Sequence, residues 1–378
     1  MSEFETIVER LEADAERAAA LPVLLGFDGT IDRLYSVVRE RSGLGECFAA
    51  FPRIEDFGGK INTLAGRSGM MELWPRREKI GGNGPICALA LAASSRRVRY
   101  IGPLGDPVDP AFGALVDAAE AVVSIGEPAV THALEFNDGK IMLPVLRSYE
   151  ALTPEHLIEG VGRERLIEWV GGSRLVCLLN WTCLPHMDGI YRSFTEAILP
   201  AAAPDPERLY FFDLADPSKH AHARIRGAVE RIAAFAPFGR TALGLNFSEA
   251  VQLCEVFGLP EPACEDASLE AAATALREAA GVDVLMIHPV DRAACATSDG
   301  AWCVRGPLCA EPVITTGAGD HLNAGFCLGL LLGWPPEDCL RLGVLFSGYY
   351  VRTAQSPSLQ DIRPFARNPG RPTPEILH

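Results

Sequence analysis

Thr315-Thr316-Gly317-Ala318-Gly319-Asp320 stands directly before a long apolar segment that begins at Leu322. A strand, a glycine-rich turn and the start of a helix, in that order, make an anion-binding site. The first N–H groups of the helix have no partner and point outward, and the helix dipole favours negative charge. Glycines at 317 and 319 let the backbone approach a phosphate closely, as a side chain would not.

Asp320 is an unusual residue for such a site, because a carboxylate repels phosphate. It makes sense as a general base that faces an acceptor hydroxyl, with the transferring phosphoryl group held between them. The alternative is that Asp320 only caps the helix, as Asp often does. A cap alone does not call for Gly-x-Gly before it, so we expect Asp320 to activate a substrate hydroxyl for phosphoryl transfer.

The rest of the chain alternates short buried strands with helices. A helix over 4–20 comes first, and Pro22 ends it. Further β-like runs lie at 98–101, 121–125, 175–179, 209–214, 242–245 and 284–288, and helical composition at 84–95, 112–119, 186–199 and 268–280. This alternation predicts an α/β fold with a mostly parallel central sheet that helices cover on both faces.

Two segments interrupt the alternation. Residues 33–79 are rich in Gly, Arg and Pro without a helical period, and 129–149 alternate like a hairpin around Asn137-Asp138-Gly139. We expect these two segments to form a small β-rich lid. The main α/β domain would then consist of residues 1–32, 80–128 and 150–378.

Composition excludes several classes of protein. The 378 residues are 48% hydrophobic and carry a net charge of −15, which disfavours nucleic acid as a partner. The eleven cysteines are scattered without a C-x-x-C pair, which indicates reduced thiols rather than disulfides or zinc. The N-terminus does not resemble a signal peptide, and the longest apolar stretch is too short to span a bilayer. We expect a cytoplasmic protein with no membrane partner; its oligomeric state stays open, with a homodimer as one option.

The chain resembles the ribokinase (PfkB) family of carbohydrate kinases over roughly residues 23–360. Four elements in the family's order carry the resemblance. They are Gly81-Gly82-Asn83-Gly84-Pro85 before an Ala-rich helix, Tyr100 to Asp106, Asn246-Phe247-Ser248-Glu249, and Thr316 to Asp320 followed by Ala324-Gly325-Phe326.

This resemblance implies a Rossmann-like main domain, a small β lid over the sugar site, and transfer of a nucleotide's γ-phosphate to an alcohol. Gly317, Ala318 and Gly319 would form the anion hole and Asp320 the base. The acceptor, a sugar or nucleoside, would be bound by Asp28, Asp32, Gly82, Asn83 and Glu135. The alternatives are that Asp28-Gly29 only forms a turn and that Asn83 only caps a helix.

The resemblance also assigns the nucleotide and the metal. Asn246 and Glu249 would position Mg²⁺ through water, since Mg²⁺ keeps much of its hydration shell, although a helix-capping pair is the alternative. Gly319, His288 and Arg292 would lie at the nucleotide. Because His288 lies on an apolar strand, a core histidine is its default interpretation.

Some positions depart from the family pattern. Ile314 stands where the signature usually opens with Asp, so potassium activation is in doubt, and His321 follows the base in place of a small residue. His288-Pro289-Val290-Asp291-Arg292-Ala293 replaces a glycine-containing nucleotide segment, which leaves Arg292 able to reach a phosphate. Gly26 to Asp32, Leu134 to Phe136 and Ile287-His288 are instead similar to ADP-dependent sugar kinases. We expect ATP as donor, with ADP as the second choice.

Two other functions compete with a kinase. Phe27-Asp28-Gly29-Thr30 is similar to the box of aspartate-nucleophile phosphatases, but Gly26 occupies the place of the attacking carboxylate. A non-catalytic sugar- or nucleotide-binding protein with the kinase fold is the second rival. Asp320 argues against it, because a binding protein has little use for a base in an anion site.

Overall fold

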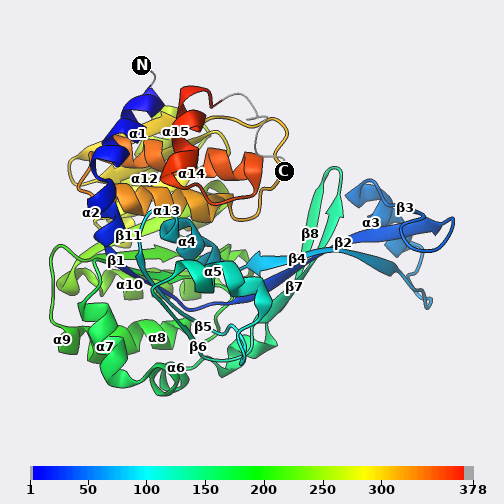
Figure 1. Ribbon diagram of the computed structural model, residues 1–378, viewed down its shortest axis with the longest axis horizontal. Helices are drawn as coiled ribbons and strands as arrows, with labels where there is room; N and C mark the ends of the chain where they lie inside the picture. Colours follow the sequence, from blue (N-terminus) through cyan, green and yellow to red (C-terminus); the bar gives the residue numbers. More distant parts are fainter. Residues whose placement is uncertain (1–2, 370–378) are drawn as a thin grey trace.

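The computed structural model describes residues 3–369 and is built on a nine-stranded sheet (Figure 1). Residues 1–2 and 370–378, which we assigned to the main domain, lie outside the described part. The strands are, in spatial order, β14 (Gly300–Arg305), β13 (Arg292–Thr297), β12 (Val284–His288), β11 (Arg240–Asn246), β10 (Leu209–Asp213), β9 (Leu175–Leu179), β1 (Pro22–Gly26), β5 (Arg97–Gly102) and β6 (Ala121–Ser124).

The seven strands from β12 to β6 pair in parallel, as the alternation predicts. The hairpin of β13 and β14 adds an antiparallel edge that the sequence analysis missed. Its turn is the short polar segment Ser298-Asp299, and β13 is too rich in Ala to show a clear β pattern.

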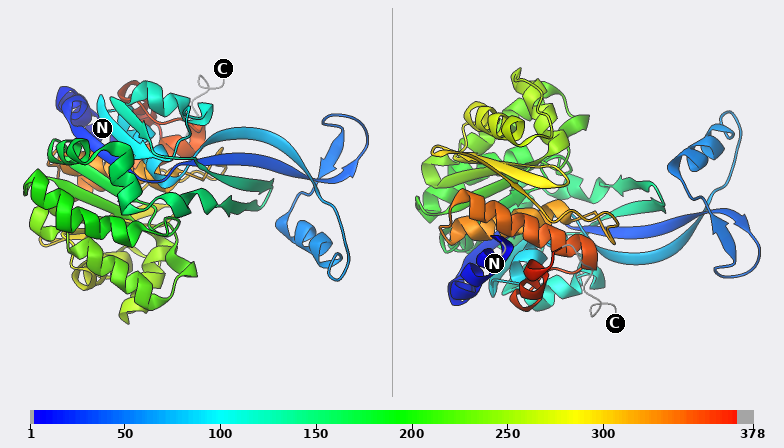
Figure 2. Two further views of the ribbon diagram at one scale, coloured as in Figure 1. Left: turned by 90° about the horizontal axis from the view of Figure 1, so that it is seen from below. Right: turned by 90° about the horizontal axis from the view of Figure 1, so that it is seen from above.

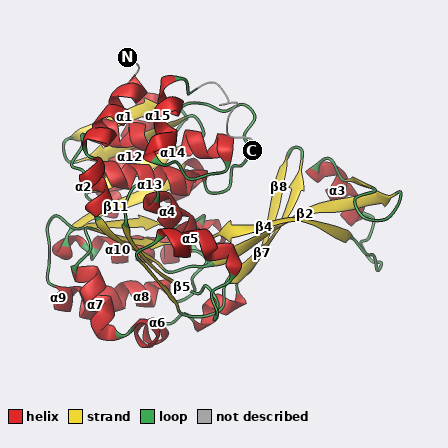
Figure 3. Ribbon diagram, viewed as in Figure 1, coloured by secondary structure: helices red, strands yellow, loops and turns green. Residues whose placement is uncertain are grey.

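Successive strand residues point into two separate cores, because side chains alternate across a sheet. Val23 and Leu25 enter one core and Leu24 enters the other. Figure 3 shows the resulting layers of helix, sheet and helix. The first core is covered by α1 (Glu3–Ala13), α2 (Ala15–Ala20), α4 (Asn83–Ala92), α5 (Gly113–Ala118), α13 (Ala318–Leu331), α14 (Pro336–Thr353) and α15 (Leu359–Arg367). The second is covered by α6 (Pro154–Val161), α7 (Arg163–Gly171), α8 (Met187–Ser193), α9 (Leu199–Ala202), α10 (His222–Ala233), α11 (Phe247–Phe257) and α12 (Asp266–Ala280).

A second sheet projects from this body as a long ribbon (Figure 2). Its strands are β2 (Thr30–Arg41), β3 (Phe48–Ala50), β4 (Glu72–Gly81), β7 (Ala129–Phe136) and β8 (Gly139–Val145). Helix α3 (Ile54–Asn62) packs at its outer end, where the sequence showed no helical period; its Phe57 joins a small core with Val37, Phe51 and Leu134.

Two junctions tie the second sheet to the body. Strand β2 begins four residues after β1 ends, and β4 ends at Gly81, two residues before α4 starts. Residues 27–32 and 81–84 therefore lie where the two sheets meet.

No helix within residues 3–369 is long and apolar enough to cross a membrane.

Candidate active site

The glycine-rich turn starts α13 in a conformation that needs glycine. Gly317 precedes the helix with φ of 97°, in the left-handed region, and a Cβ there would lie 2.9 Å from the Tyr350 hydroxyl. A Cβ on Gly319 would lie 3.1 Å from Cε1 of His288. A side chain at either position would therefore crowd the start of α13, where the Ala318 N–H donates to the Thr315 carbonyl at 3.1 Å.

His321 and Tyr350 hold this turn from behind. Their rings stack with centroids 3.7 Å apart. His321 Nδ1 lies 2.7 Å from the Gly317 carbonyl oxygen and Nε2 lies 2.8 Å from Ser356 Oγ, while the Tyr350 hydroxyl donates to the Thr316 carbonyl at 3.0 Å. Burial lowers the pKa of His321 to about 4, so the ring is neutral at neutral pH. A carbonyl only accepts, so Nδ1 carries the proton and Nε2 accepts from Ser356.

Asp320 follows the turn and is only 7% exposed. Burial raises its pKa well above the ordinary carboxyl value, and the charges of Asp213 and Asp28 raise it further. A hydrogen bond with Asn83 and the charge of Lys79 act in the opposite direction. A carboxylate with a raised pKa is a stronger base than an exposed one, which suits proton abstraction near neutral pH.

Two further carboxylates lie at the ends of parallel strands, each beside a buried amide. Asp28 accepts from Asn180 Nδ2 at 2.7 Å and from the Gly84 N–H at 2.9 Å. Asp213 accepts from Asn323 Nδ2 at 2.8 Å. Burial raises the pKa of both carboxyls to about 6. The side-chain oxygens of Asn180 and Asn323 are buried without a hydrogen-bond partner among the described residues.

Asn246 and Glu249 form the helix cap that the sequence analysis kept as an alternative role. Asn246 Oδ1 accepts from the Glu249 N–H at 3.0 Å, and Glu249 Oε2 accepts from the Asn246 N–H at 2.8 Å. Glu249 Oε1 accepts from the Asp216 N–H at 2.8 Å. Burial, together with the charge of Asp213, raises the pKa of Glu249 to about 8. Residues 3–369 contain no cluster of three or more His, Cys, Asp or Glu side chains that could hold a metal directly.

Two cavities meet at this point. The Asp320 cavity, of about 470 Å³, is lined by Asp32, Asn83, Asn180, Asp213 and Asp320 among others. The Phe247 cavity, of about 600 Å³, is lined by Phe247, Val290, Leu308, Leu322 and Val344 among others. Asn246, His288 and Gly319 line both, so a ligand in one cavity can reach a ligand in the other beside the turn.

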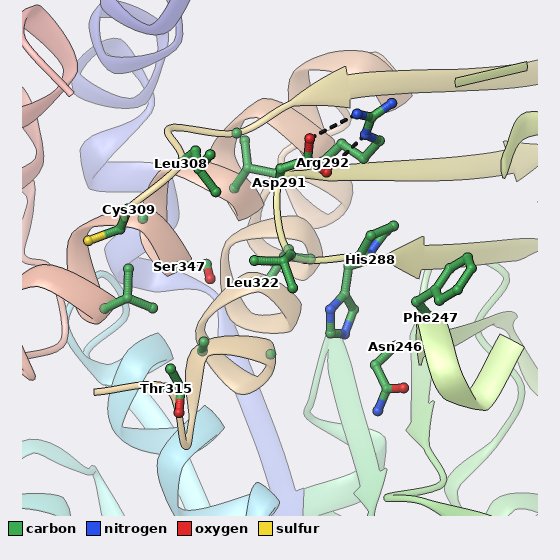
Figure 4. Close-up of a pocket in the computed structure, with 18 of the residues that line it drawn as sticks. Asn246, Phe247, His288, Asp291, Arg292, Leu308, Cys309, Thr315, Leu322 and Ser347 are labelled. Atoms are coloured by element: carbon green, nitrogen blue, oxygen red, sulfur yellow. Dashed lines mark hydrogen bonds and ion pairs between the residues drawn. The ribbon is translucent and has the colours of Figure 1, made fainter. Parts of the chain in front are cut away.

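Figure 4 shows the Phe247 cavity with His288 between Asn246 and the loop of Thr315. Burial lowers the pKa of His288 to about 4, so this ring is also neutral. Arg292 lies at the far side from Thr315, and its guanidinium donates to Asp291 at 2.8 and 3.0 Å (Figure 4). It also donates to Asp266 at 2.5 Å. Its charge is therefore already paired with carboxylates.

The structure brings most of the predicted site residues together and separates a few. The Asp320 cavity collects Asp32, Gly82, Asn83, Asn246, Glu249, His288, Gly317, Gly319 and Asp320. Ala318 and Arg292 line the Phe247 cavity instead. Asp28 is fully buried beside Asn180, and Glu135 lines a third, smaller cavity.

Several polar residues of the site carry no motif and were missed. Asn180 and Asp213 lie at the carboxyl ends of the neighbouring strands β9 and β10, and their position after predicted parallel strands is the signal that could have found them. Lys79 and Lys140 come from the second sheet. Lys79 lies 3.5 Å from Asp32, and Lys140 donates to Thr316 Oγ1 at 2.9 Å.

Comparisons with known proteins identify the family and the fold of this chain. The family model for prokaryotic ketohexokinase matches residues 6–368. A ketohexokinase from Haloferax volcanii is 29% identical over 361 residues, covering 94% of this chain and 93% of that protein. Ribokinase from Thermotoga maritima covers 93% of this chain and 100% of its own with a TM-score of 0.60 at 16% identity.

An Arabidopsis thaliana ribokinase, solved with ribose and ATP, has a TM-score of 0.61 at 16% identity and covers 92% of this chain and 99% of its own. At these identities the solved structures establish the fold, which is the ribokinase-like α/β fold expected from the sequence. The family model spans nearly the whole chain and therefore establishes the family as well as the fold. The chain belongs to the prokaryotic ketohexokinase family, within the ribokinase (PfkB) group of carbohydrate kinases.

Proposed function

We propose that this carbohydrate kinase transfers the γ-phosphoryl group of ATP to a hydroxyl of a ketohexose, with Asp320 as the general base. The observation that carries the proposal is the place of Asp320. It is a buried carboxylate with a raised pKa, in the first turn of α13. Its cavity meets a second cavity beside the start of that helix. The Haloferax volcanii relative is a ketohexokinase, which supports a ketohexose as acceptor.

In this proposal each cavity holds one substrate. The acceptor lies in the Asp320 cavity, where Asp32 and Asn83 accept from and donate to its hydroxyls. The nucleotide lies in the Phe247 cavity, with its phosphates at the start of α13 beside Gly319. The acceptor oxygen attacks the γ-phosphorus, the bond to the β-phosphate oxygen breaks, and Asp320 takes the hydroxyl proton.

ATP is the preferred donor because a ribokinase of the same fold was solved with it, and ADP is the alternative. A magnesium ion, when bound with the nucleotide, would offset the charge of the phosphates. Glu249 fits such an ion, because the charge of Asp213 raises its pKa and a nearby cation would relieve that repulsion. Both oxygens of Glu249 already accept backbone N–H groups, which favours contact through water.

The second sheet acts as a lid in this proposal. We assign residues 33–79 and 129–149 to the lid and 1–32, 80–128 and 150–378 to the body. The hydrogen bond from Lys140 to Thr316 Oγ1 supports the assignment, since it joins a lid strand to the loop before the anion site. A cytoplasmic location is part of the same proposal and is supported by the cysteines, all eleven of which are free.

Nucleotide consumption should be measured with fructose, ribose and adenosine as acceptors and with MgATP and MgADP as donors. We expect turnover with fructose and MgATP. Asp320→Asn protein, prepared in the same way, controls for contaminating kinases. Absence of turnover with every pair, from protein that still binds a nucleotide by calorimetry, would instead favour a non-catalytic binding protein.

A further inference from the structure

We infer that the acceptor site continues into a cationic subsite, so that the enzyme favours a sugar carrying an anionic group, a phosphate or a carboxylate, over a neutral one. The inference rests on the proposed function, since it concerns the acceptor of that reaction. It starts from a third cavity, of about 220 Å³, which lies against the Asp320 cavity. Asp32, Met142 and Thr316 line both, so one ligand can occupy the two together.

The lining of this third cavity is positively charged. Its basic residues are Arg76, Arg77, Lys79 and Lys140, and its acidic residues are Asp32 and Glu135. Four positive charges therefore face two negative ones, in a chain whose net charge is −15. An excess of positive charge at this one place is the pattern expected of a site that binds an anion.

Lys79 is the buried member of the set. Its side chain is 10% exposed and lies 3.5 Å from Asp32, whose side chain is 5% exposed. Burial lowers the pKa of Lys79, Asp32 opposes this, and the charges of Lys140 and Arg77 lower it again. The cations thus repel one another across the cavity, and an anion between them would remove that repulsion.

Arg77 and Lys140 supply positive charge that no carboxylate matches. The side chain of Arg77 makes no hydrogen bond or ion pair with any residue between 3 and 369. Lys140 donates to Thr316 Oγ1, a neutral group, and forms no ion pair with Glu135, its neighbour across the β7–β8 hairpin. Arg76 differs from both, because Ser36 and Glu46 engage it on the outer side.

The order of groups along the two cavities defines the ligand. Asp320 marks the end where the reacting hydroxyl lies, Asp32 stands at the boundary, and the cations lie beyond it. An acceptor that fits has hydroxyls in its middle and an anionic group at the end remote from the reacting one. A ketose monophosphate or a keto-sugar acid has this arrangement. The chemistry is unchanged: the hydroxyl gains the γ-phosphoryl group, the nucleotide loses it, and Asp320 receives the proton.

The test compares fructose, fructose 6-phosphate and 2-keto-gluconate as acceptors at fixed MgATP. We expect kcat/KM for at least one anionic acceptor to exceed that for fructose by about tenfold or more, as charge-assisted hydrogen bonds are roughly twice as strong as neutral ones. The phosphate and the carboxylate arms tell which anion the subsite takes. Raising the salt concentration should reduce this preference.

Arg77→Gln and Lys140→Gln provide the matched substitutions, and Arg39→Gln, an exposed arginine of the same sheet outside the cavity, is the control. We expect the ratio of anionic to neutral kcat/KM to fall about tenfold in both variants and to stay at the wild-type value in Arg39→Gln. Thermal melts confirm that each variant is folded.

The outcomes separate this inference from the proposed function. If fructose is phosphorylated best and neither variant changes the ratio, the cationic subsite is refuted and the proposed function stands. If no acceptor is phosphorylated, but calorimetry shows fructose 6-phosphate binding to the wild type and not to Arg77→Gln, the proposed function fails and the subsite stands. Loss of both turnover and binding rejects both.

Discussion

The Asp320 cavity and the Phe247 cavity meet at the same turn, yet they have opposite characters. The first is walled by buried carboxylates and amides, among them Asp32, Asp213 and Glu249. The second is walled largely by apolar side chains, and its Asp291 and Arg292 neutralise each other. The buried carboxylates are therefore concentrated on one side of α13.

This difference shows that, among the described residues, the protein buries carboxylates only on the acceptor side of the site, at a cost in folding free energy. Burying carboxylates near one another is unfavourable and raises their pKa values, which is useful where a proton must be taken up. A nucleotide brings its own charges, so its cavity needs shape and the N–H groups of α13 instead. Substitutions in the first cavity should therefore alter chemistry and acceptor choice, and the nucleotide affinity should respond little.

The largest effect should come from Asp320→Asn. We expect kcat to fall by about 10²–10⁴, the usual range for loss of a general base, with the nucleotide affinity retained. Steady-state kinetics together with calorimetric titration of the nucleotide measure both quantities. Turnover at the wild-type rate would show that Asp320 is not the general base, and the proposed difference in role between the two cavities would then fail.

Asp32→Ala should come next. Loss of a carboxylate that accepts from acceptor hydroxyls leaves Lys79 buried without its partner, and an unsatisfied buried group costs roughly 1–3 kcal/mol. We expect KM for the acceptor to rise between about fivefold and 150-fold, with the nucleotide KM changed far less. A circular-dichroism melt serves as the control, because equal weakening of both substrates would indicate a folding defect instead.

His321→Phe should have a moderate effect. The substitution keeps an aromatic ring against Tyr350 but removes the hydrogen bonds to the Gly317 carbonyl and to Ser356. At about 1 kcal/mol for each of the two hydrogen bonds, we expect kcat to fall by up to about 30-fold with the acceptor KM unchanged. Tyr350→Phe, which loses the bond to the Thr316 carbonyl, should act in the same direction. A rise in acceptor KM without a change in kcat would contradict a role in positioning the turn.

Asp213→Asn should give the smallest effect, a displacement along the pH axis. The charge of Asp213 raises the pKa of Asp320, whose active form is the deprotonated one. Without that charge the pKa of Asp320 falls, so the acid limb of kcat/KM should move to lower pH. Asn323 can accommodate the new amide by rotating, because its own oxygen has no partner. An unmoved acid limb would mean that another group controls it.

The same substitution should flatten the pH dependence of stability. The folded pKa of Asp213 is about 6, above its ordinary 3.8, so the folded state binds this proton more tightly than the unfolded state. Its contribution to stability is therefore full below pH 3.8 and is lost as the pH rises through about 6. Melting temperatures measured from pH 4 to 7 should decline less steeply in the variant than in the wild type.

The sequence predicted the parts of this molecule that depend on local pattern. The turn at Gly317, the parallel strands β5, β6 and β9 to β12, and the helices α4, α5, α8 and α12 follow from glycine spacing and hydrophobic periodicity. The β13–β14 hairpin was missed because its residues have weak strand preference, and α3 because its helix is short and exposed on most of its surface.

Long-range contacts limited the prediction of the site. Lys79 and Asp32 are 47 positions apart in the chain, and only the pairing of β2 with β4 makes them neighbours. Lys140 meets Thr316 across 176 positions. Sequence periodicity carries no information about such long-range contacts. The sequence alone therefore reveals the glycine-rich turn and Asp320, but not the polar residues of the other elements that line the same cavity.

The residues that line the two cavities come from different parts of the sequence, and this has an evolutionary consequence. Every described residue that lines the Phe247 cavity lies between 246 and 351, whereas the wall of the Asp320 cavity that faces the acceptor comes largely from positions 30 to 183. A recombination event upstream of position 246 would exchange the acceptor wall as a block and leave the nucleotide wall intact. An enzyme that arises from such an event can differ in acceptor specificity and keep the same nucleotide-binding site.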